Sequence, residues 1–158
     1  MIPEIGIFAL IIALGFSLLL LLVPSLGLWR GKAILIESTS SFVFGQFLFV
    51  GIAYLSLTIC FLQDDFSVLY VFANSSLVLP WFYKLCAVWG GHEGSMLLWI
   101  LILCLWTFAV SRCSHSLSSA MRTRVLVILG GLSAGFILFL LATSNPFARQ
   151  FQVLQTHG

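Results

Sequence analysis

The chain has 158 residues, of which 61% are hydrophobic and only 8% are charged. Soluble domains carry about a quarter charged residues, so this composition excludes a soluble globular protein, a disordered chain, a coiled coil and a disulfide-rich secreted module. The formal net charge of +2 is too small to indicate nucleic-acid binding. The composition is typical of a polytopic helical membrane protein that lies in the lipid bilayer.

Long stretches without a charged residue predict the membrane spans, because a helix needs roughly 20 mostly apolar residues to cross a bilayer. We expect an all-α fold with four transmembrane helices, over about 5–27, 41–62, 94–112 and 125–143. The first apolar run ends near Pro24 and begins after an acidic residue, Glu4. A signal peptide has a basic start and a shorter apolar core, so we expect this helix to be retained.

The long connection between the second and third helices, residues 63–93, contains a further uncharged stretch at 66–83. Its second half holds Asn74, two serines and Pro80, which do not suit a membrane-spanning helix. We interpret 66–83 as an extramembrane or interfacial segment. The alternative is a short re-entrant piece.

Lysine and arginine are distributed unequally between the two sides of the predicted bundle. The loops after the first and third helices carry Arg30, Lys32, Arg112, Arg122 and Arg124, whereas the other side carries Lys84 and Arg149. Cytoplasmic loops are enriched in lysine and arginine. We therefore expect both termini and residues 63–93 to lie on the outer side of the membrane. Trp81, Tyr83 and Trp89 then fall on the outer side, where aromatic residues form interfacial belts.

The candidate functional residues lie at the outer start of the third helix. They are Trp89, Gly90, Gly91, His92, Glu93 and Gly94. Glycines let the backbone come close to a ligand or another helix, and the following apolar helix is expected to start at Gly94 and Ser95. A helix N-terminus favours an anion, such as the carboxylate of a ligand.

Simpler roles remain open for these residues. His92 could be an interfacial hydrogen-bonding residue, a residue with a supporting or docking role, or a metal or haem ligand. Glu93 could be a charge that the helix dipole favours, and Trp89 an interface anchor.

Other sites of known chemistry are not indicated by the sequence. No phosphate-binding loop, catalytic triad or zinc-binding spacing is present, and the four cysteines fit a role as small packing residues. The adjacent Asp64 and Asp65 are expected to end the second helix rather than act as a catalytic pair. His115 is expected to be solvated, and His157 near the chain end is uninformative. The predicted span interiors hold no acidic, basic or histidine residue, which argues against a transporter.

Three outer segments together resemble one family. They are DDFSVLYV (64–71), LPWFYKLCAVWGGHEGSMLLWILIL, whose most specific part is WGGHEGSMLLW (89–99), and TSNPFAR (143–149). In this order and at these distances they are similar to the N-terminal region of CcmF-type cytochrome c biogenesis proteins, the haem lyase family that includes NrfE. The resemblance runs along essentially the whole chain.

The resemblance implies a multi-pass protein of the bacterial inner membrane or the mitochondrial inner membrane. Such a protein takes haem from a haem chaperone and helps attach it to apocytochrome c through thioether bonds on the outer face, together with other maturation subunits of the membrane. The six candidate residues would frame a haem site. We expect no catalytic residue and no iron ligand in this chain, because the family is several times longer and its ligand histidines are expected beyond Gly158.

The chain is therefore expected to be the leading, four-helix part of a haem lyase, without activity of its own. One alternative is a non-enzymatic membrane scaffold of the maturation complex. A transporter component is a less favoured alternative, since charged residues are lacking within the spans.

Overall fold

The computed structural model describes residues 1–114 and 116–149, and the regular elements in these residues are all helices. The predictions for His115 and His157 fall outside the described residues. Four helices are long and apolar enough to cross a membrane. They are α1 (Ile2–Arg30), α3 (Thr39–Leu62) with its short leading helix α2 (Ala33–Glu37), α6 (His92–Cys113) and α7 (Ser119–Thr143). The predicted all-α class with four such helices is confirmed.

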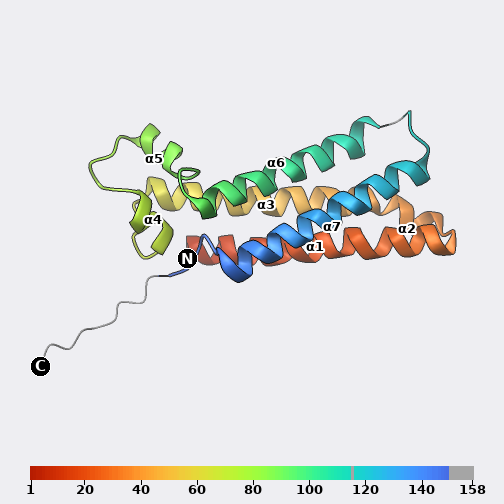
Figure 1. The fold of residues 1–158 in the computed structure, drawn as a ribbon, viewed down its shortest axis with the longest axis horizontal. Helices are drawn as coiled ribbons and strands as arrows, with labels where there is room; N and C mark the ends of the chain where they lie inside the picture. Colours follow the sequence, from red (N-terminus) through yellow and green to blue (C-terminus); the bar gives the residue numbers. More distant parts are fainter. Residues whose placement is uncertain (115, 150–158) are drawn as a thin grey trace, which may run out of the picture.

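The four long helices form an up-down-up-down bundle in which each helix runs antiparallel to its neighbours (Figure 1). Helix α1 packs against α3 and α7, and α6 packs against the same two helices from the other side. Short connections join antiparallel neighbours in such bundles, and the one long connection here lies between α3 and α6. It holds the short helices α4 (Leu69–Asn74) and α5 (Trp81–Ala87).

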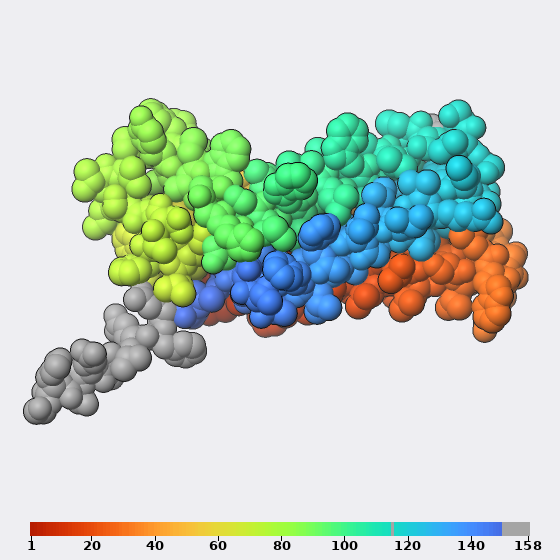
Figure 2. All heavy atoms as spheres, viewed as in Figure 1, coloured from red at the N-terminus to blue at the C-terminus, as the bar shows by residue number. Residues whose placement is uncertain are grey.

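Residues 63–91, which we call the cap, lie at the end of the bundle that also holds the N-terminus (Figure 1). The space-filling view shows the yellow and green residues of the cap covering this end (Figure 2). We call it the capped end. The capped end is the side that the lysine and arginine distribution predicts to face outward.

The first helix, expected over about 5–27, is longer at both ends and begins at Ile2. It continues to Arg30, with Pro24 buried inside it. Proline removes one backbone donor from a helix interior and kinks or weakens it. The Ser25 hydroxyl nevertheless donates to the carbonyl of Leu21 at 2.5 Å, so this turn keeps an additional local hydrogen bond. The other three long helices extend a few residues beyond the predicted bounds.

The core of the bundle is made of apolar side chains contributed by all four long helices. Leu10 of α1, Leu57 of α3, Leu97 of α6 and Leu140 of α7 have no exposed surface or almost none. Many large apolar side chains on the opposite faces are exposed, among them Leu55 and Trp99. A bundle with an apolar interior and an apolar exterior is suited to a lipid environment rather than to water.

A polar contact crosses the apolar interior. The amide nitrogen of Gln46, a fully buried residue of α3, donates to the sulfur of Cys104 on α6 at 3.3 Å. Hydrogen bonds between the side chains of membrane helices contribute little more than in water, about 0.6 kcal/mol on average. The contact links α3 to α6 inside the bundle.

Helices α1 and α3 approach closely at Gly45. A Cβ atom built on Gly45 would lie 2.7 Å from the ring of Phe16, whereas a Cβ atom on Gly51 of the same helix would meet nothing within 4 Å. The Phe16 ring stacks in turn on Phe49, with ring centroids 5.7 Å apart. Gly45 therefore provides the space that this aromatic pair occupies.

Gly45→Ala is expected to destabilise the protein by about 1–3 kcal/mol, because the added methyl group displaces the Phe16 ring. Gly51→Ala is the matched control and is expected to be neutral or stabilising by up to about 1 kcal/mol, since it places a better helix former in open space. Thermal unfolding in detergent micelles measures both. Equal effects of the two substitutions would contradict the close approach.

The predicted sidedness can be tested with the native cysteines. Cys86 in the cap and Cys113 at the opposite end are exposed, whereas Cys60 and Cys104 are buried. In intact spheroplasts, a membrane-impermeant maleimide is expected to label Cys86 alone, and Cys113 only after permeabilisation. The variants Cys86→Ser and Cys113→Ser assign each signal. Labelling of Cys113 before Cys86 would reverse the predicted topology.

Candidate functional site

The three segments that carry the family resemblance come together at the capped end. The backbone N–H of Leu69, at the start of α4, donates to the carbonyl of Ala148 at 2.9 Å. Val68 and Arg149 form an antiparallel bridge beside it. Phe147 from the segment after α7 is fully buried. Segments far apart in the sequence thus form one packed unit.

Tyr70 connects the cap to the start of α6. Its hydroxyl donates to the carbonyl of Val88 at 2.9 Å and accepts from the backbone N–H of Gly91 at 3.0 Å. The residue is only 5% exposed, and its ring meets Phe61 of α3 edge to face, with centroids 5.4 Å apart. Burial raises the pKa of the Tyr70 phenol, so the hydroxyl stays neutral and remains a donor.

The glycines of the candidate site make room for Tyr70. A Cβ atom on Gly94 would lie 1.7 Å from the carbonyl oxygen of Val88 and 2.6 Å from the Tyr70 hydroxyl. A Cβ atom on Gly91 would lie 2.6 Å from the Tyr70 ring. Gly90 differs, because its nearest neighbouring atom would be 3.5 Å away. Gly91 and Gly94 therefore serve the packing of the cap against α6.

His92 is the first residue of α6, so the helix begins two residues before Gly94, the expected start. Gly91 is the N-cap, and Glu93 lies in the first turn. His92 is exposed, and Glu93 is partly buried. The prediction that this pair sits at a helix N-terminus is confirmed.

His92 and Glu93 line a cavity of about 600 Å³ between α4, the start of α6 and the segment after α7. Side chains with hydrogen-bonding groups surround it, among them Asn74, Ser144 and Asn145. Leu69 and Ala148 add an apolar part to its lining. Its size is in the range of small-molecule sites, and its lining can accept and donate hydrogen bonds at several points.

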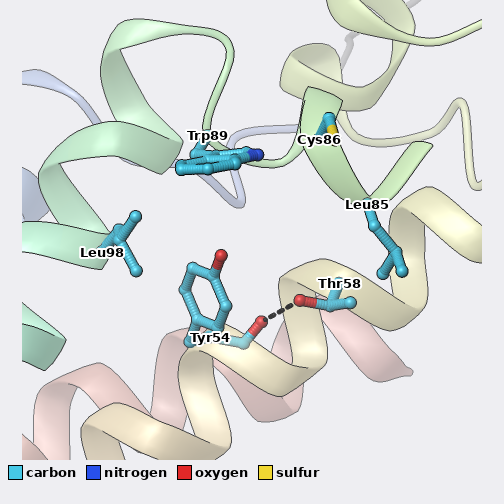
Figure 3. Close-up of a pocket in the computed structure, with 6 residues that line it drawn as sticks. All are labelled: Tyr54, Thr58, Leu85, Cys86, Trp89 and Leu98. Carbon is cyan, nitrogen blue, oxygen red and sulfur yellow. Dashed lines mark hydrogen bonds between the residues drawn. The ribbon is translucent and has the colours of Figure 1, made fainter. Parts of the chain in front are cut away.

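Trp89 is separated from this cavity. It lines a second cleft of about 300 Å³ on another side of α6, with Tyr54, Thr58, Leu85, Cys86 and Leu98 (Figure 3). In Figure 3 the indole ring of Trp89 lies opposite the hydroxyl end of Tyr54. Of the six candidate residues, three line the cavity and Trp89 lines the cleft, whereas Gly90 and Gly94 line neither.

Ion pairs join the elements of the capped end. Lys84 of α5 pairs with Asp64, just after α3, at 2.5 Å, and both side chains are largely buried. Arg149 pairs with Glu4 at the start of α1.

The sequence analysis did not identify Tyr70 and Lys84 as residues that hold the site together. The sequence did mark Lys84, because it is the only lysine or arginine between Lys32 and Arg112.

Within the part of the chain that the structure describes, no three histidine, cysteine, aspartate or glutamate side chains gather as a metal site.

The fold and this site define a polytopic helical membrane protein with a polar, packed end. Comparison with known proteins then identifies its relatives. The chain is 52% identical over 149 residues to the cytochrome c-type biogenesis protein CcmF of Pseudomonas aeruginosa and 46% identical to CcmF of Escherichia coli, with 94% of the chain covered in each case. It is 39% identical to the cytochrome c-type biogenesis protein NrfE of Haemophilus influenzae, over 96% of the chain. No protein-family model matches the chain.

A solved structure, described as the cytochrome c heme lyase CcmF, superposes with a TM-score of 0.89 at 31% identity and covers 96% of the chain. The chain is a homologue of the CcmF and NrfE cytochrome c biogenesis proteins, and the resemblance predicted from its outer segments is confirmed. It spans 23–24% of the length of the curated relatives named above and 26% of the solved chain.

Tyr70→Phe is expected to lower the free energy of unfolding by about 1–3 kcal/mol, because it leaves the Val88 carbonyl and the Gly91 N–H without their partner. Tyr83→Phe, at an exposed tyrosine of the same cap, is the control and is expected to have little effect. Thermal unfolding and limited proteolysis of the cap measure the difference. Equal stability of the two variants would show that the hydroxyl does not hold the cap.

The Lys84–Asp64 pair is expected to contribute a coupling energy of about 0.5–3 kcal/mol in a double-mutant cycle with Lys84→Met and Asp64→Asn. Asparagine suits position 64, where the backbone has a positive φ of 53°. Unfolding of the two single variants and of the double variant gives the coupling. A coupling near zero would mean that α5 is held by apolar contacts alone.

Proposed function

We propose that the chain takes part in cytochrome c maturation as a helical unit of a haem lyase, and that it helps present haem to apocytochrome c for thioether attachment on the outer membrane face. The homology to CcmF and NrfE proteins supports the proposal. The observation that carries it is the convergence of the three family-like segments around one polar cavity. These segments are far apart in the sequence, and the cavity is the feature that they share.

In this proposal haem is the substrate that becomes attached, and the residues of this chain position it. The start of α6 carries a partial positive charge that favours a carboxylate, and Asn74 and Asn145 offer amide donors. His92 is exposed at the rim and can donate to the same group. Glu93 repels a second carboxylate and so restricts how a dianionic ligand enters. Gly91 and Gly94 act through the packing of Tyr70 that shapes the cavity.

No iron ligand is assigned. His92 is the single histidine among the described residues, and it lies exposed at the first turn of α6. In this proposal His92 and the other cavity residues contact the polar edge of the ligand. Catalytic residues are likewise not assigned to this chain.

In this proposal the activity lies in a bacterial inner membrane, and a mitochondrial inner membrane is the alternative. The partners in this proposal are a haem chaperone, apocytochrome c and other membrane subunits of the maturation complex. The lipid bilayer surrounds α1, α3, α6 and α7. The activity belongs to the whole assembly, of which this chain forms one part.

Gly91→Leu is expected to reduce covalent haem attachment strongly, because the new side chain displaces Tyr70 and with it the wall of the cavity. Gly90→Leu is the matched control and is expected to retain most of the activity, because a Cβ atom there would make only ordinary contacts, at 3.5 Å or more. His92→Ala is expected to leave the haem absorbance of the complex in place. The assay expresses each variant with the remaining length of a relative in a strain without its own CcmF protein, followed by staining for covalent haem.

Loss of the haem absorbance in a stable His92→Ala protein would show that His92 is an iron ligand. Failure of the wild-type chain to restore attachment even with the remaining length supplied would contradict the proposed function. Restoration by the chain alone would show that it is active without further segments.

A further inference from the structure

The cap presents large apolar side chains to its surroundings. Leu77, Val78, Trp81, Phe82 and Tyr83 are 52–92% exposed, and we call these five residues the cap patch. The rings of Trp81 and Phe82 meet edge to face with centroids 4.8 Å apart, and Phe82 lies beside Tyr83. An exposed apolar cluster of this kind marks an interaction surface rather than a water-facing loop.

The position of α5 along the bundle axis indicates which environment the cap patch faces. Leu85 and Cys86 of α5 line the same cleft as Tyr54 and Thr58, which lie one to two turns inside the end of α3 (Figure 3). Helix α5 therefore runs beside the last turns of a membrane-spanning helix and not beyond them, as Figure 1 also shows. The Lys84–Asp64 ion pair holds it there.

Helix α5 has its polar and apolar faces reversed relative to a helix of a soluble protein. Lys84 faces the interior and is 8% exposed, and Val88, just after the helix, is 1% exposed. Trp81 and Phe82 face outward. Across the cleft that α5 shares with α3, the residues that follow Tyr54 and Thr58 in α3, Leu55 and Ile59, are also exposed. The cap patch thus continues the apolar surface of the membrane-spanning helices.

We propose that the cap patch inserts into the interfacial region of the lipid bilayer and anchors the cap in the plane of the membrane. Tryptophan and tyrosine prefer this region, where one part of the ring is apolar and the other meets water. A charged partner is not favoured, because residues 66–83 carry no charge and the cation of Lys84 is already paired with Asp64. A lipid surface requires neither ion pairs nor shape complementarity.

The depth of the patch can be measured with nitroxide labels. Val78→Cys and Phe82→Cys are made in the full chain with the exposed cysteines replaced (Cys86→Ser and Cys113→Ser), while Cys60 and Cys104 stay buried. Ser67→Cys, at an exposed position in the turn before α4, is the matched control. Each labelled protein is reconstituted in phosphatidylcholine vesicles, and electron paramagnetic resonance compares collisions with oxygen and with a water-soluble nickel chelate.

We expect the ratio of oxygen to nickel collisions to be several-fold higher at positions 78 and 82 than at position 67, because oxygen concentrates in lipid and the chelate stays in water. A ratio at 78 and 82 equal to that at 67 would place the patch in water and overturn the proposal. Labels that neither reagent reaches would show that protein covers the patch, which would also overturn it.

Discussion

The structure depends on one constraint, which is that backbone groups in a hydrocarbon environment must find hydrogen-bond partners within the protein. Helices meet this requirement by themselves, and the four long helices of this chain supply their own partners over the apolar stretches. The scarcity of charged residues inside these helices follows from the same constraint. The amide nitrogen of Gln46, which donates to Cys104, is a polar group of the interior that has found such a partner.

Where the chain leaves its helices, the same requirement is met by tertiary contacts. The cap contains turns whose backbone groups need partners, and the Tyr70 hydroxyl supplies two of them, to Val88 and Gly91. Positions 91 and 94 require glycine, because the Tyr70 phenol and the Val88 carbonyl occupy the space where a side chain would lie. The cavity next to His92 and Glu93 exists because this packing holds α4 at a fixed distance from the start of α6. Its proposed role in presenting haem thus rests on a structural contact as much as on the residues that line it.

Much of the fold was predictable because membrane helices are defined by length and hydropathy. The number of long helices and the position of the cap followed from the charge-free stretches. The end of the first helix was predicted a few residues early, since α1 contains the buried Pro24 and continues to Arg30, beyond the expected bound at about 27. The candidate site was predicted in part. The His92–Glu93 pair at a helix start could be inferred from the glycines and the following apolar run, but the separation of Trp89 into another cleft could not.

The sequence by itself determined the class of protein, its four apolar helices and its homology, because hydrophobic length and the order of short motifs are properties of the linear chain. Only the tertiary structure decided which contacts those motifs make with one another. It brought residues 64–71, 89–99 and 143–149 to one end, paired Lys84 with Asp64 over twenty residues of sequence, and placed Tyr70 against two glycines. The physical reason is that these contacts arise between segments that the antiparallel bundle carries back to the same end, and no local pattern encodes which partner each segment will meet.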